Sequence, residues 1–455
     1  MPTFAAYMDE FDSYLRGYIP PRHTWTPPEK ALYGPQNLFD IPLAEAEGMR
    51  FEALRFAFGH HYTHNAMYRG FCRERGVCPD DIRAPEDLDR IPLLSHRFFK
   101  EYPQGRDMAT WLANVHTGEL PRIVVQGQAP TFDQVVNAFN AAGMEVAHSS
   151  GTGGRHTLIP RDRRTFLAAE YAIAKSAAIM LYPGWKHATS GYLLMPNPKK
   201  TNVFAGRVCQ VYFDVIQDVE VAIDRQISAD VMRIVMSGQK GLRSTMIRFV
   251  NRLASARLVD RIILWLEHHA KARSRIALVG APYLLWAVMK KLREQGKSFD
   301  FGERGAILTG GGWKVYEGDR MPVADFRRQV AQVLGIQDRN CLDLYGMVEG
   351  NGWMIHCPEG HYLHTPYSYY KPLVLDEEYK PLGYGQWGRF AFLDAAAHSY
   401  PGFILTGDVA RLLQRCPVCD RPGPVLEPEV RRASGEDLRG CGEEVRRMVT
   451  ADMGG

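Results

Sequence analysis

Apolar side chains recur along several stretches of the chain at the spacing of amphipathic helices. Residues 43–75 and 163–181 carry this pattern, and we expect the second helix to pack on a sheet. Residues 228–270 are predicted to be mostly helical, with basic side chains on a solvated face rather than on a nucleic-acid-binding surface. A further helix is predicted to run through residue 292, with Pro282 at its first position.

Short strand-like runs lie between these helices. The alternation of helices and strands predicts an α/β fold whose sheets are largely buried. Residues 1–48 show no sustained period and contain Pro20-Pro21 and Pro27-Pro28, so we expect an irregular N-terminal arm there. The predicted strands cover residues 144–147, 157–160, 192–195, 207–213, 275–279, 306–308 and 342–345, and a last one begins at residue 403.

Length and composition restrict the class of protein. The 455 residues are 45% hydrophobic, which is enough for a large core. Lys and Arg number 55 against 51 Asp and Glu, a balance that indicates neither nucleic acid nor an anionic membrane as an obligatory partner. No run approaches the ~20 apolar residues of a membrane span. Residues 1–15 lack the basic start of a signal peptide, so we expect a cytoplasmic protein.

A cluster of glycines and hydroxyl side chains predicts a phosphate-binding loop. Its glycines let the backbone approach an anion, its N–H groups and hydroxyls donate hydrogen bonds, and Arg155 adds a positive charge. The loop runs into a second strand rather than into a helix, which excludes a Walker-type loop. The alternative is a glycine-rich hairpin turn that binds nothing. The residues of the predicted loop are Ser149, Ser150, Gly151, Thr152, Gly153, Gly154, Arg155, His156 and Thr157.

The strand at 306–308 is followed by three glycines and a lysine. Gly310, Gly311 and Gly312 allow a flat purine to lie against bare backbone, and Lys314 can reach a phosphate. Taken alone, this run is also compatible with an ordinary strand end.

Two later strands end in residues suited to a nucleotide and its metal. Tyr345 and Gly346 end one of them, where the tyrosine can cover the base, and Glu349 can hold Mg²⁺. The last strand is predicted to break at a Thr-Gly-Asp sequence, where Asp408 can accept both hydroxyls of a ribose. An ordinary strand end or turn is the alternative for each.

In this order, the phosphate loop, the Tyr-Gly-x-x-Glu segment and the Thr-Gly-Asp segment resemble the motifs of the adenylate-forming enzymes. Within that superfamily, residues 309–314, 356–364, 399–405 and 437–441 look like the acyl-protein synthetases of bacterial bioluminescence. They are more distantly similar to the phenylacetate-CoA ligases. The resemblance covers residues from about 50 to 445.

The resemblance implies that ATP and Mg²⁺ activate a carboxylic acid, fatty or aromatic, to an acyl-adenylate. It implies that the acyl group then moves to Cys441, from which a partner acyl reductase makes an aldehyde. Arg431, Arg432 and Arg439 would lower the pKa of this thiol, although Gly442-Glu443-Glu444 stands where the family has a small hydrophobic residue. The alternative is an inert thiol in a loose tail. The remaining implied roles are Arg155 at the pyrophosphate, Tyr345 beside the nucleotide, Glu349 at Mg²⁺ and Asp408 at the ribose.

The resemblance also implies a large α/β domain of stacked sheets and helices at residues 49–428, followed by a tail at 429–455. Most adenylate-forming enzymes continue into a small C-terminal domain with a catalytic lysine. Most or all of that domain is expected to be missing here, because the sequence ends at Gly455 and its last lysine is Lys380. The candidates to replace that lysine are Lys314, Arg155 and Arg411, or else Mg²⁺ and the loop alone handle the charge.

The eight cysteines are sparse and irregularly spaced, which favours thiols or metal ligands over a disulfide framework. Cys416 and Cys419 have metal-ligand spacing, and Cys357 with one of three nearby histidines would complete a structural zinc site. The predicted set is Cys357, His361, Cys416 and Cys419, with His356 and His364 as alternatives to His361. Free cysteines at a turn are the alternative.

Four functions therefore compete. The first is a self-acylating acyl-protein synthetase, and the second is an acyl- or aryl-CoA ligase. The third is an adenylate-forming ligase that passes the acyl group to an amine or an acyl-accepting carrier protein, and the fourth is a nucleotide-binding module without turnover. The expected absence of the C-terminal domain favours the first over the second, and the presence of both Glu349 and Asp408 disfavours the fourth.

Overall fold

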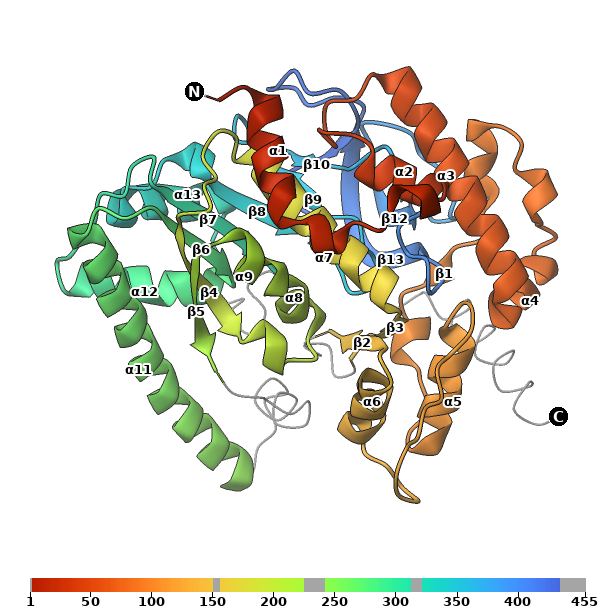
Figure 1. Cartoon of the computed structure of the whole chain (residues 1–455), viewed down its shortest axis with the longest axis horizontal. Coiled ribbons are helices and arrows are strands. Elements are labelled where there is room, and N and C mark those ends of the chain that lie inside the picture. The colour runs from red at the N-terminus through yellow and green to blue at the C-terminus, as the bar shows by residue number, and fades with distance from the viewer. Residues whose placement is uncertain (1, 150–155, 225–241, 312–320, 434–455) are drawn as a thin grey trace.

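The computed structural model describes residues 2–149, 156–224, 242–311 and 321–433. Within these residues the chain forms one large mixed sheet and a separate two-stranded hairpin, surrounded by helices (Figure 1). The strand order of the large sheet is β11-β12-β13-β14-β10-β9-β8-β7-β6-β4-β5, with β1 and β15 paired to β13. The predicted α/β fold is confirmed.

The half of the large sheet that contains β4 to β8 is parallel. Register pairs Ala277 with Ala306 and Val279 with Leu308. Because side chains alternate between the two faces of a strand, these four share one face. The strands of this half are β5 (Asp218–Ile223), β4 (Ser190–Pro196), β6 (Ile276–Gly280), β7 (Gly305–Gly310) and β8 (Cys341–Tyr345).

The other half is antiparallel and contains the Thr-Gly-Asp sequence. The predicted break at this sequence is wrong, since β13 continues through it. The register with β12 shifts here, so that residues 406–408 stand opposite Phe390 alone and form a bulge. The strands are β9 (Met354–His356), β10 (Leu363–His364), β14 (Val425–Leu426), β13 (Phe403–Leu413), β12 (Trp387–Asp394) and β11 (Tyr370–Leu375), with β1 (Leu94–Ser95) and β15 (Arg431–Arg432) beside β13.

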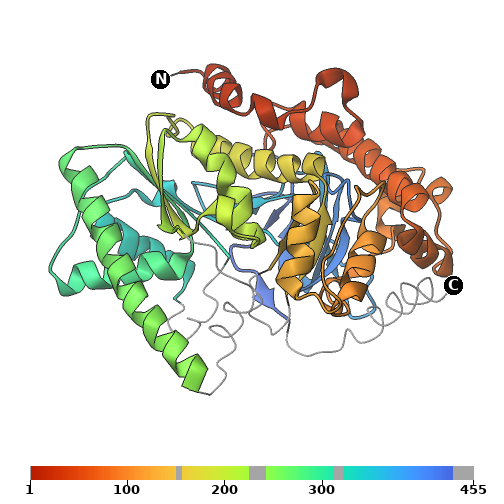
Figure 2. The ribbon, with the colours of Figure 1, turned by 60° about the horizontal axis from the view of Figure 1, so that its bottom comes forward.

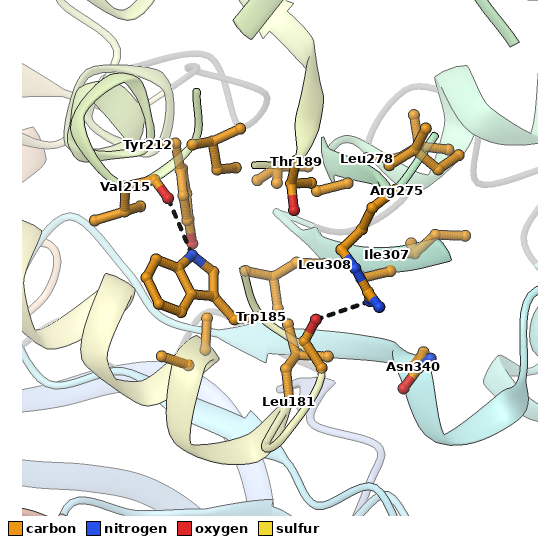
Figure 3. Close-up of a pocket in the computed structure, with 18 of the residues that line it drawn as sticks. Leu181, Trp185, Thr189, Tyr212, Val215, Arg275, Leu278, Ile307, Leu308 and Asn340 are labelled. Atoms are coloured by element: carbon orange, nitrogen blue, oxygen red, sulfur yellow. Dashed lines mark hydrogen bonds between the residues drawn. The ribbon is translucent and has the colours of Figure 1, made fainter. Parts of the chain in front are cut away.

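Helices cover both faces of the parallel half (Figures 1 and 2). One face carries Ile276, Leu278 and Ile307 and packs against α11 (Leu242–Lys271), α12 (Pro282–Glu294) and α13 (Val323–Leu334). The opposite face packs against α7 (Arg163–Met180), where a narrow cavity remains between helix and sheet (Figure 3).

Helix α7 confirms the helix predicted at 163–181. Asp162 caps its first turn by accepting a hydrogen bond from the Thr165 N–H over 2.7 Å. Fifteen of its side chains are buried, among them Glu170 and Lys175. Such all-round burial means that α7 lies between the sheet and a further layer.

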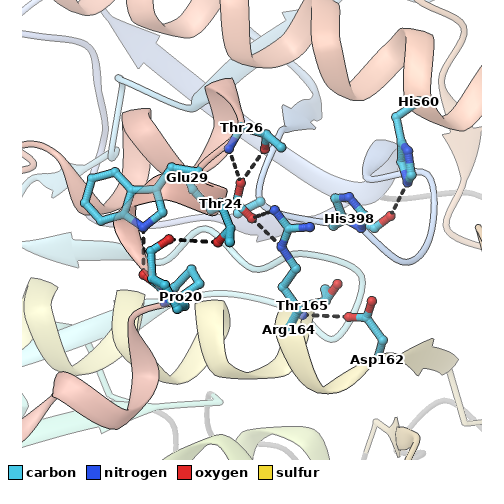
Figure 4. Close-up of polar contacts among 12 residues, drawn as sticks. Pro20, Thr24, Thr26, Glu29, His60, Asp162, Arg164, Thr165 and His398 are labelled. Carbon is cyan, nitrogen blue, oxygen red and sulfur yellow. Dashed lines mark hydrogen bonds and ion pairs between the residues drawn. The ribbon is translucent and has the colours of Figure 1, made fainter.

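That further layer includes the N-terminal residues, which are not the irregular arm we expected. The arm is helical in α1 (Phe4–Tyr14), η1 (Arg16–Tyr18), η2 (Arg22–Thr24) and α2 (Pro27–Tyr33). Pro27 and Pro28 begin α2 rather than interrupting a helix, since a proline at the first helical position loses no hydrogen bond. Glu29 pairs with Arg164 at the start of α7 and also accepts from Thr26 (Figure 4). The Tyr7 hydroxyl donates to the Ala178 carbonyl over 2.9 Å.

The remaining elements complete the described fold. The strand predicted at 207–213 is wrong, because these residues are helical in α8 (Phe204–Arg207), η7 (Val208–Val211) and α9 (Tyr212–Val215). No helix in the described part of the chain is long and apolar enough to cross a membrane. The other helices are α3 (Leu43–His64), α4 (Ala66–Glu74), α5 (Arg106–Val115) and α6 (Phe132–Ala141), with 3-10 turns η3 (Pro79–Asp81), η4 (Pro85–Arg90), η5 (Phe98–Lys100), η6 (Pro198–Lys200) and η9 (Asp338–Asn340).

Candidate active site

The predicted phosphate loop joins the strands of the small hairpin, β2 (Glu145–His148) and β3 (Leu158–Arg161). Its two ends are tied together, since the Ser149 N–H donates to the Thr157 carbonyl over 2.9 Å and the Thr157 N–H donates to the Ser149 hydroxyl over 2.8 Å. The residues between them, Ser150, Gly151, Thr152, Gly153, Gly154 and Arg155, lie outside the described residues.

Thr157 also connects the loop to the predicted metal ligand. Its side chain lies beside the carboxylate of Glu349, which is only 5% exposed. Burial raises the pKa of Glu349, while the positive charge of Lys100 and the polar Thr157 side chain oppose this rise. A cation bound at this carboxylate would likewise favour its ionised form, so the environment fits a metal ligand.

The backbone around Glu349 is held by a buried arginine that the sequence motifs do not include. Arg161 is 0% exposed and donates to the carbonyls of Val348, over 2.5 Å, and Gly350, over 3.2 Å. It also donates to the Tyr400 hydroxyl, which in turn donates to the Glu349 carbonyl over 3.1 Å. Because four polar groups converge here, the segment that carries Glu349 is fixed in place.

The Tyr-Gly-x-x-Glu and Thr-Gly-Asp segments meet directly. The Tyr345 hydroxyl donates to the Asp408 carboxylate over 2.7 Å. Burial and the neighbouring carboxylate raise the pKa of Tyr345 well above its usual range, so the hydroxyl keeps its proton and stays a donor. The other Asp408 oxygen lies 3.0 Å from Nη1 of Arg432.

Arg411 and Gly346 were predicted to lie at the nucleotide, but in the structure each contacts other parts of the protein. Arg411 donates to the Gly385 carbonyl and pairs with Glu427 over 2.9 Å. It lies an odd number of residues from Asp408 along β13 and therefore points to the opposite side of the strand. A Cβ at Gly346 would lie 2.4 Å from the Trp353 ring, so this glycine is required for packing.

The glycine run after β7 is described only at its start. Gly310 ends the strand, and a Cβ there would meet its neighbours at ordinary contact distances of 3.6 Å, so the site is not crowded. Gly311 has a φ of 78°, a conformation that favours glycine. Gly312 and Lys314 lie outside the described residues, as does Cys441.

In a second cluster, three of the predicted metal ligands lie beside one of the alternative histidines. The ligand atoms of Cys357, His364, Cys416 and Cys419 all lie within 4.8 Å of one another, and all four residues are buried. The predicted His361 is not among them, because its Nε2 atom lies 2.8 Å from the Asp338 carboxylate. Of the histidines left open by the sequence, His364 therefore completes the group.

The geometry of this cluster fits a tetrahedral ion. Tetrahedral zinc holds two sulfurs about 3.8 Å apart and a sulfur and a nitrogen about 3.5 Å apart. The Sγ atoms of Cys357 and Cys416 are 4.0 Å apart, and Cys419 Sγ lies 3.3 Å from His364 Nε2. Both separations are within a few tenths of an ångström of the expected values.

Comparison with known proteins shows which family of adenylate-forming enzymes the chain belongs to. The family described as acyl-protein synthetase, LuxE, matches residues 218–450, about half of the chain. The chain belongs to the acyl-protein synthetase family. It is also 24% identical, over 416 residues that cover 91% of each chain, to the long-chain-fatty-acid–luciferin-component ligase of Vibrio harveyi. The ligase of the same name from Aliivibrio fischeri is 24% identical over 413 residues, which cover 90% of this chain and 91% of the relative.

Solved structures show the fold of this acyl-protein synthetase. An open conformation of 2-hydroxyisobutyryl-CoA ligase, solved with 2-HIB-AMP and CoA, superposes with a TM-score of 0.56 at 16% identity. The match covers 89% of this chain and 73% of that one. The fold is therefore that of the adenylate-forming ligases, as the ordered motifs predicted. The prediction of an ATP-dependent, acid-activating ligase that forms an acyl-adenylate and transfers the acyl group is confirmed by the family.

Sequence reasoning missed two residues of this acyl-protein synthetase that lie beside the motifs. Arg161 donates a hydrogen bond to the backbone next to Glu349, and Lys100 carries a charge that interacts with Glu349 and Asp408. Neither belongs to a recognisable motif. A lysine in a short Phe-Phe-Lys turn carries no local signal, and only the pairing of β1 with β13 places it near the site.

Proposed function

We propose that this acyl-protein synthetase activates a long-chain fatty acid and transfers the acyl group to Cys441. The observation that carries the choice of acid is the apolar cavity between α7 and the parallel strands (Figure 3). The names of the two bacterial relatives point to the same class of acid.

The cavity is narrow and lined largely by small apolar side chains. Alanines face one another across it, from Ala174, Ala177 and Ala178 on α7 to Ala277 and Ala306 on β6 and β7. Its volume is about 60 Å³, which is room for several methylene-sized groups. A narrow apolar channel of this kind suits an alkyl chain better than an aromatic ring.

The orientation of the cavity relative to the sheet supports its assignment as the site of the alkyl chain. Its polar lining residues Thr189, Arg275, Glu303 and Asn340 all stand just before β4, β6, β7 and β8 respectively, at the amino edge of the parallel strands. The apolar lining continues to Leu308, next to the Thr-Gly-Gly run at the carboxyl edge. An acid whose carboxylate lies at the nucleotide would therefore direct its chain under α7.

The nucleotide residues would act by position and charge. Asp408, oriented by Tyr345, would accept the ribose hydroxyls, and Glu349 with Thr157 would hold Mg²⁺. Mg²⁺ bound there would neutralise phosphate charge. The substrate carboxylate is already ionised at pH 7, so its attack on the α-phosphorus, with pyrophosphate leaving, needs no protein base.

The position of the residues just before the tail supports Cys441 as the acceptor of the acyl group. The last described residues lie against the Thr-Gly-Asp sequence, because β15 pairs with β13 and the Ala433 N–H donates to the Gly407 carbonyl over 3.1 Å. From Ala433, the eight residues to Cys441 span at most about 28 Å. The thiol is therefore within reach of an adenylate in the site, and residues 49–428 and 429–455 are proposed to act as core and acyl-carrying tail. An acyl-accepting reductase is the corresponding partner.

The second cluster is proposed to hold a structural zinc ion. Four protein ligands leave no open position for catalysis. Cys357 and His364 follow the segment that carries Glu349, and Cys416 and Cys419 lie in the turn between β13 and β14. Zinc there would tie these two segments together behind the nucleotide site.

The experiment that tests the proposed function is ATP–pyrophosphate exchange with saturated fatty acids of increasing length and with aromatic acids. Exchange that rises with chain length supports the proposal, and exchange with aromatic acids alone contradicts it. Acyl transfer is tested with labelled fatty acid and ATP. We expect a hydroxylamine-sensitive label on the wild-type protein and none on Cys441→Ser. A label that persists in this variant would mean that another group is the acceptor.

A further inference from the structure

The segment that leads to Lys100 lies along the Thr-Gly-Asp bulge. Strand β1 pairs in parallel with β13, with Ser95 opposite Leu405, and the His96 N–H donates to the Leu405 carbonyl over 2.9 Å. The His96 ring packs so closely on Gly407 that a Cβ there would lie 2.8 Å from its Nε2 atom. The turn η5, which contains Lys100, follows directly and also contacts β3 at the end of the phosphate-loop hairpin.

Lys100 is a half-buried cation with no direct partner among the described residues. In the described part of the chain, its ammonium makes no hydrogen bond or ion pair. Its charge interacts favourably with Glu349 and Asp408, while burial lowers its pKa. The cost of holding an unpaired ammonium in a partly buried site indicates that a ligand with negative charge completes its surroundings.

The covalent structure of ATP indicates which of its groups would lie beside Lys100. Its α-phosphate lies between the ribose and the β- and γ-phosphates. Asp408 is assigned to the ribose and Glu349 to the metal on the phosphates, so a cation that interacts with both lies beside the phosphate between them. We propose that Lys100 is a catalytic residue of adenylation whose ammonium contacts the α-phosphate. This inference rests on the proposed roles of Glu349 and Asp408.

The role in the reaction is electrostatic. A carboxylate oxygen of the acid forms a bond to the α-phosphorus, and the bond from that phosphorus to the bridging oxygen of pyrophosphate breaks. The bonding electrons leave with pyrophosphate, and the Lys100 proton stays on nitrogen throughout. A fixed ammonium beside the α-phosphate stabilises the negative charge that the equatorial oxygens carry in the transition state.

Other described cations near the site are less suited to this role. Arg161 is fully buried and directed at backbone carbonyls. Arg432 is paired with Asp408, and its side chain is 75% exposed. Arg411 is paired with Glu427, on the other side of β13. Lys100 is partly buried, and within the described ranges its ammonium forms no hydrogen bond or ion pair.

The test compares Lys100→Ala and Lys100→Arg with Lys297→Ala, whose lysine is on the surface and paired with Glu267. We expect Lys100→Ala to lower kcat for ATP–pyrophosphate exchange by about 100-fold or more, with KM for ATP changed by only a few fold. Lys100→Arg should recover part of the rate because it keeps the charge, and Lys297→Ala should match the wild type.

The outcomes separate this inference from the proposed function. If the wild type exchanges pyrophosphate and Lys100→Ala does so within a few fold of it, Lys100 is not catalytic and the function stands. Equal losses in ATP affinity, thermal stability and rate for both variants would make Lys100 a structural residue and overturn the inference. A wild-type protein without exchange for any acid overturns the function and the role of Lys100 together.

Discussion

The Tyr345 hydroxyl and the Asp408 carboxylate, 2.7 Å apart, join two strands that are far apart in the order of the large sheet. Tyr345 ends β8, the last strand of the parallel half, whereas Asp408 lies in the bulge of β13 in the antiparallel half. The hydrogen bond therefore couples the two halves at the point where the nucleotide is proposed to bind. It also leaves the tyrosine ring beside the carboxylate that is assigned to the ribose.

Removing either partner should weaken ATP binding by different amounts. Asp408→Ala loses charge-assisted hydrogen bonds to the ribose and should weaken binding by about 2 kcal/mol, or roughly 30-fold. Tyr345→Phe only loosens the carboxylate and should cost about 1 kcal/mol. Titration calorimetry with ATP measures both, with Tyr192→Phe on the far face of the sheet as the control. Unchanged affinity in Asp408→Ala would remove its assignment.

Arg432 should compete with ribose for Asp408. Its guanidinium occupies one carboxylate oxygen at 3.0 Å, but its side chain is 75% exposed, and such pairs contribute at most about 1 kcal/mol. Arg432→Ala should therefore tighten ATP binding, by up to about fivefold, and leave thermal stability unchanged. Weaker binding in this variant would instead mean that Arg432 contacts the nucleotide.

The cavity under α7 offers a test of acyl-chain length. Ala177→Phe places a ring among the facing alanines and should exclude the end of a long chain. We expect exchange with long fatty acids to fall at least 10-fold, while exchange with short acids is retained. The short acids serve as the internal control for folding. Equal losses at every chain length would place the acid elsewhere.

The long, strongly patterned helices could be predicted from the sequence, and the short mixed segments could not. The run at 207–213 is rich in Val, Tyr and Phe, and periodicity alone does not separate so short an apolar run from a helix. The N-terminal prolines suggested an irregular arm, yet Thr26-Pro27-Pro28-Glu29 has the composition of a helix start with a capping box. The sequence therefore contains a helix-start signal, although two proline pairs in one short segment favour irregular structure.

Some residues of the candidate site could likewise be predicted from the sequence, and others could not. Tyr345, Glu349 and Asp408 could be chosen because they stand in local motifs at strand ends. Lys100 and Arg161 could not, since their roles depend on which strands pair and on what is buried beneath the motif. The sequence contains no signal that separates His361 from His364 as the fourth ligand. In the structure His361 has a left-handed backbone conformation in a turn, with φ 59°, and its ring is directed to Asp338.

A buried glutamate in α7 should make stability fall as pH rises. Glu170 is 0% exposed, and burial raises its pKa from 4.5 to about 8, with Glu145 and Asp214 adding to the shift and Arg163 opposing it. The folded chain keeps this proton where the unfolded chain loses it, so the contribution is complete below about pH 4.5 and is lost as pH approaches 8. Glu170→Gln should remove this loss.

Urea denaturation at pH 5, 7 and 8.5 measures the effect. Glu170→Gln should be more stable than the wild type by several kcal/mol at pH 8.5, and the difference should shrink toward pH 5. The exposed Glu377→Gln serves as the control and should follow the wild type at each pH. A difference that is constant with pH would mean that Glu170 is ionised in the folded chain.

The four-residue cluster should carry zinc whose loss destabilises the region behind Glu349. We expect metal analysis of the purified protein to find one zinc ion per chain, and Cys419→Ser to abolish it. Removing a structural ligand leaves three buried polar groups around an incomplete site, so the variant should unfold at a lower temperature, and a strong chelator should lower the wild-type Tm in the same way. Cys209→Ser, which changes a buried cysteine outside the cluster, is the matched control and should keep its zinc even if its own Tm falls. Wild-type protein that contains no zinc, and whose Tm does not respond to added zinc or to chelator, would show that these residues are four packed side chains rather than a metal site.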